Sequence, residues 1–197
     1  ALFARKSEDA GVDAVVAEGF EAGGHNGREE TTTLCLIPAV RRATSLPLIA
    51  AGGIGTGDAI LAVEALGAEG VQIGTRFLIA EECPVHNNMK QKLIEAVDTD
   101  TIVTGQTIKS AVRGIKNKFA EEYQALEFSG KADKATLLEK ATGTNKLAAV
   151  DGDVENGMMQ AGQSLTPLKK IEPMAVIMEN LVAEARETLK KAAEIKL

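Results

Sequence analysis

The sequence lacks long hydrophobic runs and an excess of basic residues. Its longest apolar runs, such as residues 46–51, are far shorter than the roughly 20 residues that a membrane-spanning helix needs. No basic segment followed by an apolar one stands at its start. The net charge of −6 argues against nucleic acid as the main partner, because phosphate binding requires a clustered basic surface. We therefore expect a cytoplasmic protein that binds neither membrane nor nucleic acid.

Cysteine and histidine are also scarce, with two residues of each. Cys35 and Cys83 lie in different segments without the spacing of a metal site, so we expect free thiols in a reducing compartment and no bound metal. Hydrophobic residues make up 45% of the 197 positions, which is enough for a sizeable core. These features predict a globular protein.

The first half of the chain alternates short apolar runs with helical patterns. Strands are expected at residues 12–17, 46–51 and 69–74, and helices at 31–44 and 56–67. Strands separated by helices through short connections are typical of parallel βαβ units with an apolar, covered sheet. The sequence therefore predicts an α/β fold.

The second half changes character, because it carries helical patterns and few strand-like runs. Helices are expected at residues 86–97, 132–150 and 171–195, and a polar stretch at 129–133. A complete (β/α)₈ barrel takes about 250 residues, and three strands are visible here. We expect the C-terminal portion of a larger TIM barrel with a helical appendage, divided into barrel (1–80), inserted helical segment (81–165) and packing helix (166–197).

Each expected strand ends in a glycine-rich turn. The turns follow residues 17, 51 and 72, and ligands of parallel α/β folds bind where the carboxyl ends of the strands meet. Glycine lets backbone N–H groups approach an anionic oxygen, and a following helix N-terminus adds favourable charge. Gly52, Gly53, Gly74 and Thr75 therefore predict a phosphate site, although tight turns alone would also use these glycines.

His25 follows Gly23 and Gly24 in the first of these turns. An imidazole titrates near neutrality and can donate or abstract a proton, so a histidine beside two ligand-type turns is a candidate catalytic residue. A structural hydrogen-bonding role is the alternative. Glu21 could orient the imidazole or be a solvated turn carboxylate. His86 has no glycine context, and we expect it on the surface.

Residues 11–27, 48–77 and 162–164 carry the motifs GVDAVVAEGFEAGGHNG, LIAAGGIGTGDAILAVEALGAEGVQIGTRF and GQS. They resemble the flavin-dependent family that includes nitronate monooxygenases (2-nitropropane dioxygenases) and type II enoyl-acyl-carrier-protein reductases. The resemblance covers nearly the whole chain and leans toward the reductase branch beyond residue 78. It implies a TIM barrel that binds FMN at the ends of its strands. The N-terminal portion of the family is absent from this sequence, and half a barrel with an open sheet edge is not expected to be stable alone.

The resemblance also implies roles for individual residues. His25 falls on the catalytic histidine of the family, and Glu18 replaces a glutamine that is common in the monooxygenase branch. The positions that fall on its FMN-binding residues or beside them are Glu18, Gly23, Gly24, Ala51, Gly52, Gly53, Gln72, Ile73, Gly74 and Thr75.

The activity that the resemblance implies is reduction of the 2,3 double bond of enoyl-acyl-carrier-protein thioesters in fatty acid synthesis, with NADH or NADPH as electron donor. The alternative within the family is FMN-dependent oxidation of nitronates with oxygen. A non-catalytic ligand-binding barrel is the alternative of another class. The expected partner is an acyl-carrier-protein-linked or other small-molecule substrate, and the resemblance leaves a homodimer open.

Overall fold

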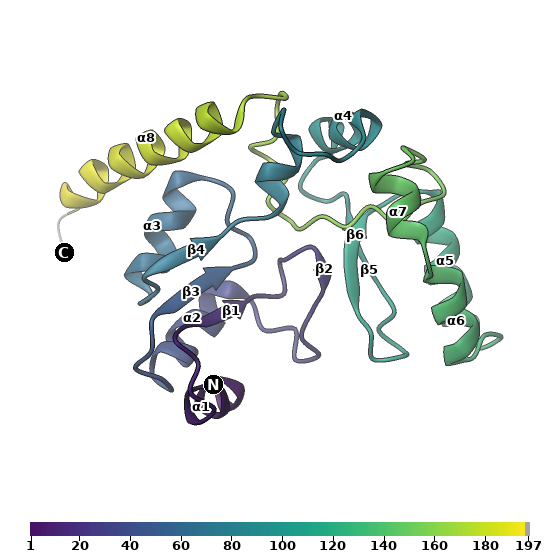
Figure 1. The fold of residues 1–197 in the computed structure, drawn as a ribbon, viewed down its shortest axis with the longest axis horizontal. Helices are drawn as coiled ribbons and strands as arrows, with labels where there is room; N and C mark the ends of the chain where they lie inside the picture. The colour runs from purple at the N-terminus through teal and green to yellow at the C-terminus, as the bar shows by residue number, and fades with distance from the viewer. Residues whose placement is uncertain (196–197) are drawn as a thin grey trace.

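A computed structural model describes residues 1–195 of the chain (Figure 1). The strands are β1 (Val15–Glu18), β2 (Gly24–His25), β3 (Leu48–Ala51), β4 (Gly70–Gln72), β5 (Thr101–Thr104) and β6 (Val112–Ile115). The α-helices are α1 (Leu2–Asp9), α2 (Thr33–Arg41), α3 (Gly57–Ala65), α4 (Asn87–Glu95), α5 (Lys118–Phe128), α6 (Lys134–Ala141), α7 (Thr144–Ala149) and α8 (Met174–Ala193). A short 3₁₀ helix, η1, spans Thr75–Ile79.

The first sheet is parallel and has the strand order β1-β3-β4. Alternate residues point to opposite faces of a strand, and Ala17, Leu48 and Ala50 are buried in one apolar cluster with Ile37 of α2 and Val63 of α3. The two helices therefore cover the same face of this sheet, as in a barrel. On the other face Val16 remains 47% exposed. Both edges of this sheet, β1 and β4, are unpaired within residues 1–195.

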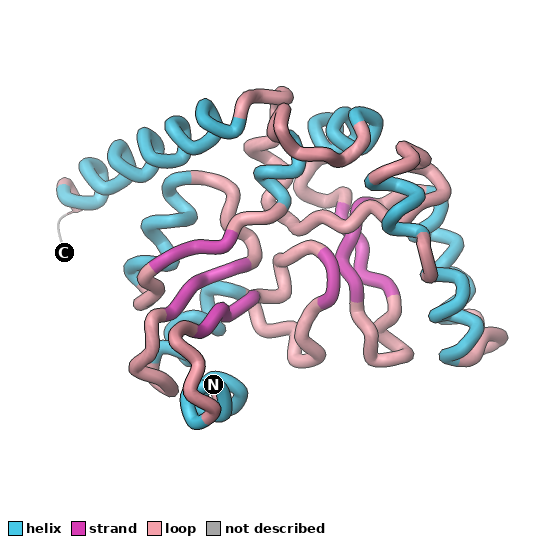
Figure 2. The backbone as a smooth tube through the Cα atoms, viewed as in Figure 1, coloured by secondary structure: helices cyan, strands magenta, loops and turns pink. Residues whose placement is uncertain are grey.

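The second sheet is antiparallel, with the order β2-β6-β5, and it lies beside the parallel sheet (Figures 1 and 2). Strands β5 and β6 form a hairpin, and β2 adds to it through the pairs Gly24 with Arg113 and His25 with Val112. The second half has few strands, as expected, but β5 and β6 themselves were not predicted. The strands of this sheet are two to four residues long, and β6 contains Arg113 and Gly114, so its sequence shows no clear apolar alternation.

Helices α5, α6 and α7 flank the hairpin on the side away from the parallel sheet (Figure 1). The single helical stretch expected at 132–150 is divided into α6 and α7, because Gly143 adopts a φ of 79° at the break. His86 is half-buried, and its Nδ1 accepts a hydrogen bond from the backbone N–H of Asn88 at 3.1 Å. His86 thus lies at the start of α4 as its N-cap, and it keeps part of its surface exposed.

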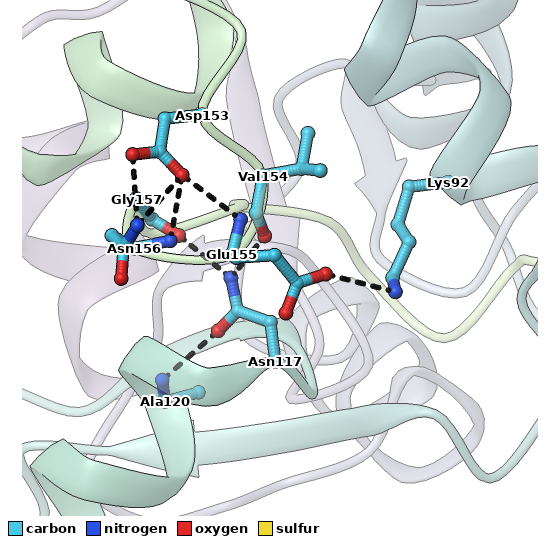
Figure 3. A network of polar contacts seen from close by, with 8 residues as sticks. All are labelled: Lys92, Asn117, Ala120, Asp153, Val154, Glu155, Asn156 and Gly157. Carbon is cyan, nitrogen blue, oxygen red and sulfur yellow. Dashed lines mark hydrogen bonds and ion pairs between the residues drawn. The ribbon is translucent and has the colours of Figure 1, made fainter.

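Asn117 connects α5 to the turn formed by residues 153–157 (Figure 3). Its Nδ2 donates to the carbonyls of Val154 and Gly157 at 2.7 and 2.8 Å, and its Oδ1 accepts from the N–H of Ala120 at 2.9 Å. The side chain is 6% exposed. One buried amide thus caps a helix and fixes the turn that leads into residues 158–164.

Helix α8 packs against α3. A Cβ atom on Gly57 would lie 2.2 Å from the backbone nitrogen of Ala185, so glycine permits the close approach of the two helices. A carboxylate oxygen of Glu184 accepts a hydrogen bond from the N–H of Gly57 at 2.8 Å. None of the helices within residues 1–195 combines the length and apolar character required to cross a bilayer.

Candidate active site

The carboxyl ends of the three parallel strands lie in register. Glu18 of β1 is opposite Ala51 of β3, and Ala51 is opposite Gln72 of β4. The glycine-rich turns that follow these strands therefore begin side by side, as their common position after parallel strands predicts.

The turns surround a cavity of about 240 Å³, which we call the glycine cavity. Part of its wall comes from the segment after the helical appendage, which runs past the strand ends. Its lining residues are Glu18, Glu21, Ala22, Gly23, Ala51, Gly52, Gly53, Ile54, Gln72, Gly74, Thr75, Leu78, Gln160, Ala161, Gly162 and Ser164. Of the expected FMN-binding positions, Gly24 lies in β2 and Ile73 packs into apolar clusters, while the others line this cavity.

The glycines around this cavity serve different purposes. Gly52 and Gly53 have φ values of 90° and 73°, which favour glycine. A Cβ on Gly23 would lie 2.5 Å from the carbonyl carbon of Ala161, so this glycine permits close packing. Gly74 has a φ of −106°, and a Cβ there would meet no atom within 4 Å. The fold therefore does not require glycine at 74, and close approach of a ligand to the backbone would explain it.

Several backbone donors in the turns around this cavity are unpaired within residues 1–195, and three of the four belong to residues that line it, namely Gly53, Ile54 and Thr75. The N–H groups of Gly53, Ile54, Thr75 and Arg76 have no hydrogen-bond acceptor in the described part of the chain. The Thr75 hydroxyl accepts from the buried N–H of Gly162 at 2.8 Å, which fixes its orientation. Such groups of free N–H donors bind anionic oxygens, so the turns at 52–54 and 74–76 suit a phosphate.

The N-terminus of α3 does not contribute in the expected way. We expected it to offer its positive end to the phosphate, but the carboxylate of Glu184 accepts from its first N–H, that of Gly57. Asp58 adds a second carboxylate to the first turn of α3. Negative side chains already occupy this terminus. Binding of the phosphate would therefore depend on the N–H groups of the turns.

Two carboxylates of this cavity have different environments. Partial burial raises the pKa of Glu18 above its ordinary value. The Glu21 carboxylate accepts from the N–H of Thr33 at 2.9 and 3.0 Å and from its hydroxyl at 3.0 Å. Glu21 thus joins the first glycine turn to α2. These contacts account for Glu21 as a structural residue, and the expectation that it orients His25 has no support in them.

His25 lies in a second cavity of about 250 Å³, which we call the histidine cavity. Its wall is mainly apolar and comes from the β5–β6 hairpin and from helices α5 to α7. The lining residues are His25, Thr104, Gly105, Ile108, Ser110, Val112, Tyr123, Leu138, Ala141, Thr142, Gly143, Asn145, Met158 and Gln160. The imidazole is exposed to this cavity rather than to the glycine cavity, and Gln160 lines both.

A buried carboxylate fixes the hairpin tip that forms one wall of the histidine cavity. Glu127, 5% exposed, accepts from the N–H groups of Gly105 and Thr107 at 2.8 Å each, and from the Thr107 hydroxyl at 3.0 Å. Burial, followed by the nearby Glu127 carboxylate, raises the pKa of Tyr123. The Tyr123 phenol is therefore neutral at physiological pH.

Arg113 of β6 holds the two sheets together. Its Nε donates to the carbonyl of Phe20 at 3.0 Å, and its guanidinium lies 4.8 Å from the centre of the Phe20 ring. Its Nη1 donates to the hydroxyl of Thr101 at 3.0 Å. Burial lowers the pKa of Arg113, but guanidinium remains charged in proteins. This contact fixes the hairpin relative to the turn that precedes His25.

Sequence reasoning assigned no role to Gln160, Gly162 or Ser164, although the GQS motif includes the last two. A Cβ on Gly162 would lie 2.6 Å from the carbonyl oxygen of Glu21, which shows how tightly this segment packs against the first turn. A glycine shortly before a serine is by itself only a weak indication of a binding site. The long-range contact with the first turn is what makes these residues part of the site.

Comparisons with known proteins agree with this arrangement. A family model described as nitronate monooxygenase matches residues 1–184. A probable nitronate monooxygenase of Staphylococcus aureus (strain N315) is 37% identical over 191 residues, which are 93% of this chain and 53% of that protein. The chain thus spans about half the length of the curated relatives it matches.

Two solved structures are similar to this fold. FabK from Thermotoga maritima has a TM-score of 0.92 and 41% sequence identity, with 98% of this chain and 60% of that chain covered. Nitroalkane oxidase from Streptomyces ansochromogenes has a TM-score of 0.80 and 32% identity, with 96% and 56% covered. The expected α/β fold, a portion of a TIM barrel, is confirmed. The chain belongs to the nitronate monooxygenase family.

Proposed function

We propose that this chain forms the flavin-binding and catalytic part of an FMN-dependent oxidoreductase. Two observations support the binding of FMN: the unpaired N–H groups at residues 53–54 and 75–76, and the open space beside Gly74. These groups would hold the phosphate. Glu18, Ala51 and Gln72, which lie in register at the strand ends, would lie along the rest of the cofactor.

The reaction that we propose is reduction of the 2,3 double bond of an enoyl thioester. FMN, when bound, supplies the two-electron exchange between NADH or NADPH and the acceptor. In the product the β-carbon has gained a hydride and the α-carbon a proton. His25 would donate the proton to the α-carbon or polarise the thioester carbonyl.

The observation that carries this choice is the apolar histidine cavity. Its volume of about 250 Å³ and its lining by Ile108, Leu138 and Met158 suit a hydrocarbon chain next to His25. A short nitronate would leave much of this apolar surface uncovered. The similarity to FabK supports the same choice.

Nitronate oxidation is the second candidate, because the curated relatives are probable nitronate monooxygenases. In that reaction His25 would act as a base or contact the nitro group. The glycine cavity would bind FMN for either reaction. The two reactions therefore differ in the electron acceptor, which is an enoyl thioester in one and oxygen in the other.

Anaerobic reduction and reoxidation of the flavin-loaded protein test the proposal. We expect NADH or NADPH to bleach the flavin absorbance, and crotonyl-CoA to restore it faster than oxygen does. Rapid turnover of propyl-2-nitronate with oxygen, together with slow reoxidation by crotonyl-CoA, would instead establish the monooxygenase reaction. Protein that unfolds cooperatively in urea, and is therefore folded, but retains no flavin would contradict both and favour a non-catalytic binding protein.

A further inference from the structure

Gln160 lies at the junction of the glycine cavity and the histidine cavity and lines both. Its backbone forms an antiparallel bridge with Gly114 of β6, and the N–H of Ile115 donates to the carbonyl of Met159 at 2.9 Å. The same strand pairs with Gly24 and His25 through Val112 and Arg113. Strand β6 therefore fixes Gln160 close to Gly24 and to His25, and His25 lines the histidine cavity.

The Gln160 side chain lies over Gly24. Gly24 has a φ of 84°, and a Cβ there would lie 3.5 Å from Oε1 of Gln160 and 3.9 Å from its Cδ. Even a Cβ at Gly24 would only touch the carboxamide at van der Waals distance, so the carboxamide lies directly against this backbone where the two cavities meet.

The hydrogen-bonding capacity of this carboxamide is almost unused. Its Nε2 lies 3.8 Å from Sδ of Met158, and a thioether is a weak acceptor. Its Oε1 has no partner within residues 1–195. Gln160 is half-buried, so little water would compete once the cavities are filled. An amide with free donors at this place is suited to a ligand that reaches both cavities.

We propose that Gln160 is a substrate-contacting residue, which donates an amide N–H to the oxygen of the group that reacts while the apolar chain lies in the histidine cavity. This inference rests on the proposed function. In an enoyl thioester that oxygen is the carbonyl, where negative charge grows as the β-carbon gains a hydride. A fixed donor aimed at such an oxygen stabilises the transition state. A nitronate oxygen would be bound by the same chemistry.

The test compares Gln160→Leu and Gln160→Glu in the flavin-loaded protein, with Gln91→Leu as control. Leucine removes the amide, and ionised glutamate at pH 8 keeps the shape but cannot donate. Gln91 is an exposed glutamine of α4. Three quantities are measured: FMN affinity from flavin fluorescence, butyryl-CoA affinity from the change in flavin absorbance, and the anaerobic rate of reoxidation by crotonyl-CoA.

We expect both Gln160 variants to slow reoxidation by about 10²-fold, the usual loss for one such donor. Both should weaken butyryl-CoA binding, while FMN affinity stays near that of Gln91→Leu. If only Gln160→Leu reoxidises slowly, the residue merely fills space and the proposal is overturned. Unchanged reoxidation rates in both variants, or an equal loss of FMN affinity, would also overturn it.

A separate outcome concerns the proposed function. If crotonyl-CoA does not reoxidise the wild-type flavin, the reductase reaction fails, and the same variants are then measured with propyl-2-nitronate and oxygen. A loss of about 10²-fold in both Gln160 variants would support the contact with a substrate oxygen. If both Gln160 variants turn over propyl-2-nitronate at the wild-type rate, the proposed contact of Gln160 with the substrate is overturned.

Discussion

The glycine cavity and the histidine cavity lie next to each other but are built differently. The glycine cavity depends largely on backbone register, because Glu18, Ala51 and Gln72 occupy equivalent ends of parallel strands. The histidine cavity depends on side chains from distant segments, such as Glu127, which fixes the hairpin tip. One cavity therefore rests on backbone geometry and would bind the cofactor mainly through main-chain groups, while the other rests on particular side chains. Substitutions should therefore separate cofactor binding from chemistry.

The largest effect is expected for His25→Ala. Loss of a positioned acid or base slows a reaction by about 10²- to 10⁴-fold, so reoxidation by crotonyl-CoA should fall within that range in stopped-flow absorbance measurements. The flavin should remain bound, because His25 does not line the glycine cavity. The control is His86→Asn, which keeps a side chain able to cap α4. Unchanged kinetics in His25→Ala would assign this histidine a structural role.

Asn117→Ala should have the next largest effect, on stability. The change removes an N-cap and leaves the carbonyls of Val154 and Gly157 without their donor (Figure 3). We expect the free energy of unfolding to fall by about 2–4 kcal/mol. Urea unfolding measures this value, and exposed Asn156→Ala, which loses contacts to Asp153, should cost about 0.5 kcal/mol or less. Equal losses in the two variants would contradict a special role for Asn117.

The two cavities also differ in how far sequence alone predicts them. The strands that end near 18, 51 and 72 follow from local apolar runs and glycine turns, and the structure places them in one register. The hairpin could not be predicted in this way, because β6 buries Arg113, whose partner Phe20 is far away in the sequence. Gln160 was missed for the same reason, since its position depends on a bridge to Gly114.

Gly74→Val should produce a smaller effect, confined to the glycine cavity. A Cβ at 74 would meet no protein atom within 4 Å and needs no positive φ, so we expect the fold to tolerate valine there. The valine side chain would fill the space through which a phosphate approaches the N–H of Thr75. Hydrogen bonds to charged groups contribute about 1.5–3 kcal/mol, so FMN affinity should fall about 10- to 100-fold in a fluorescence titration.

Gly53→Val is a less selective test of the same site. Gly53 has a φ of 73°, and its Cβ would lie 3.2 Å from that of Glu21, so valine there strains the turn itself. We expect this variant to lose both FMN and thermal stability. Unchanged FMN affinity in Gly74→Val would exclude the turn at 74–76 as a phosphate site.

Glu18→Gln should have the smallest effect, which is a change in how the stability of the protein depends on pH. Burial raises the pKa of Glu18 in the folded state above that in the unfolded state, so the folded protein binds more protons between the two values. The stability of the wild type should therefore decline as pH rises from about 4.5 through the folded pKa, whereas the glutamine variant has no such group. Urea midpoints measured without flavin should favour Glu18→Gln at pH 7, and the two proteins should converge below pH 4.5. Glu64→Gln, at an exposed position of α3, serves as control. An advantage of Glu18→Gln that persists at low pH would mean that the gain comes from packing, and that the carboxylate itself does not destabilise the glycine cavity.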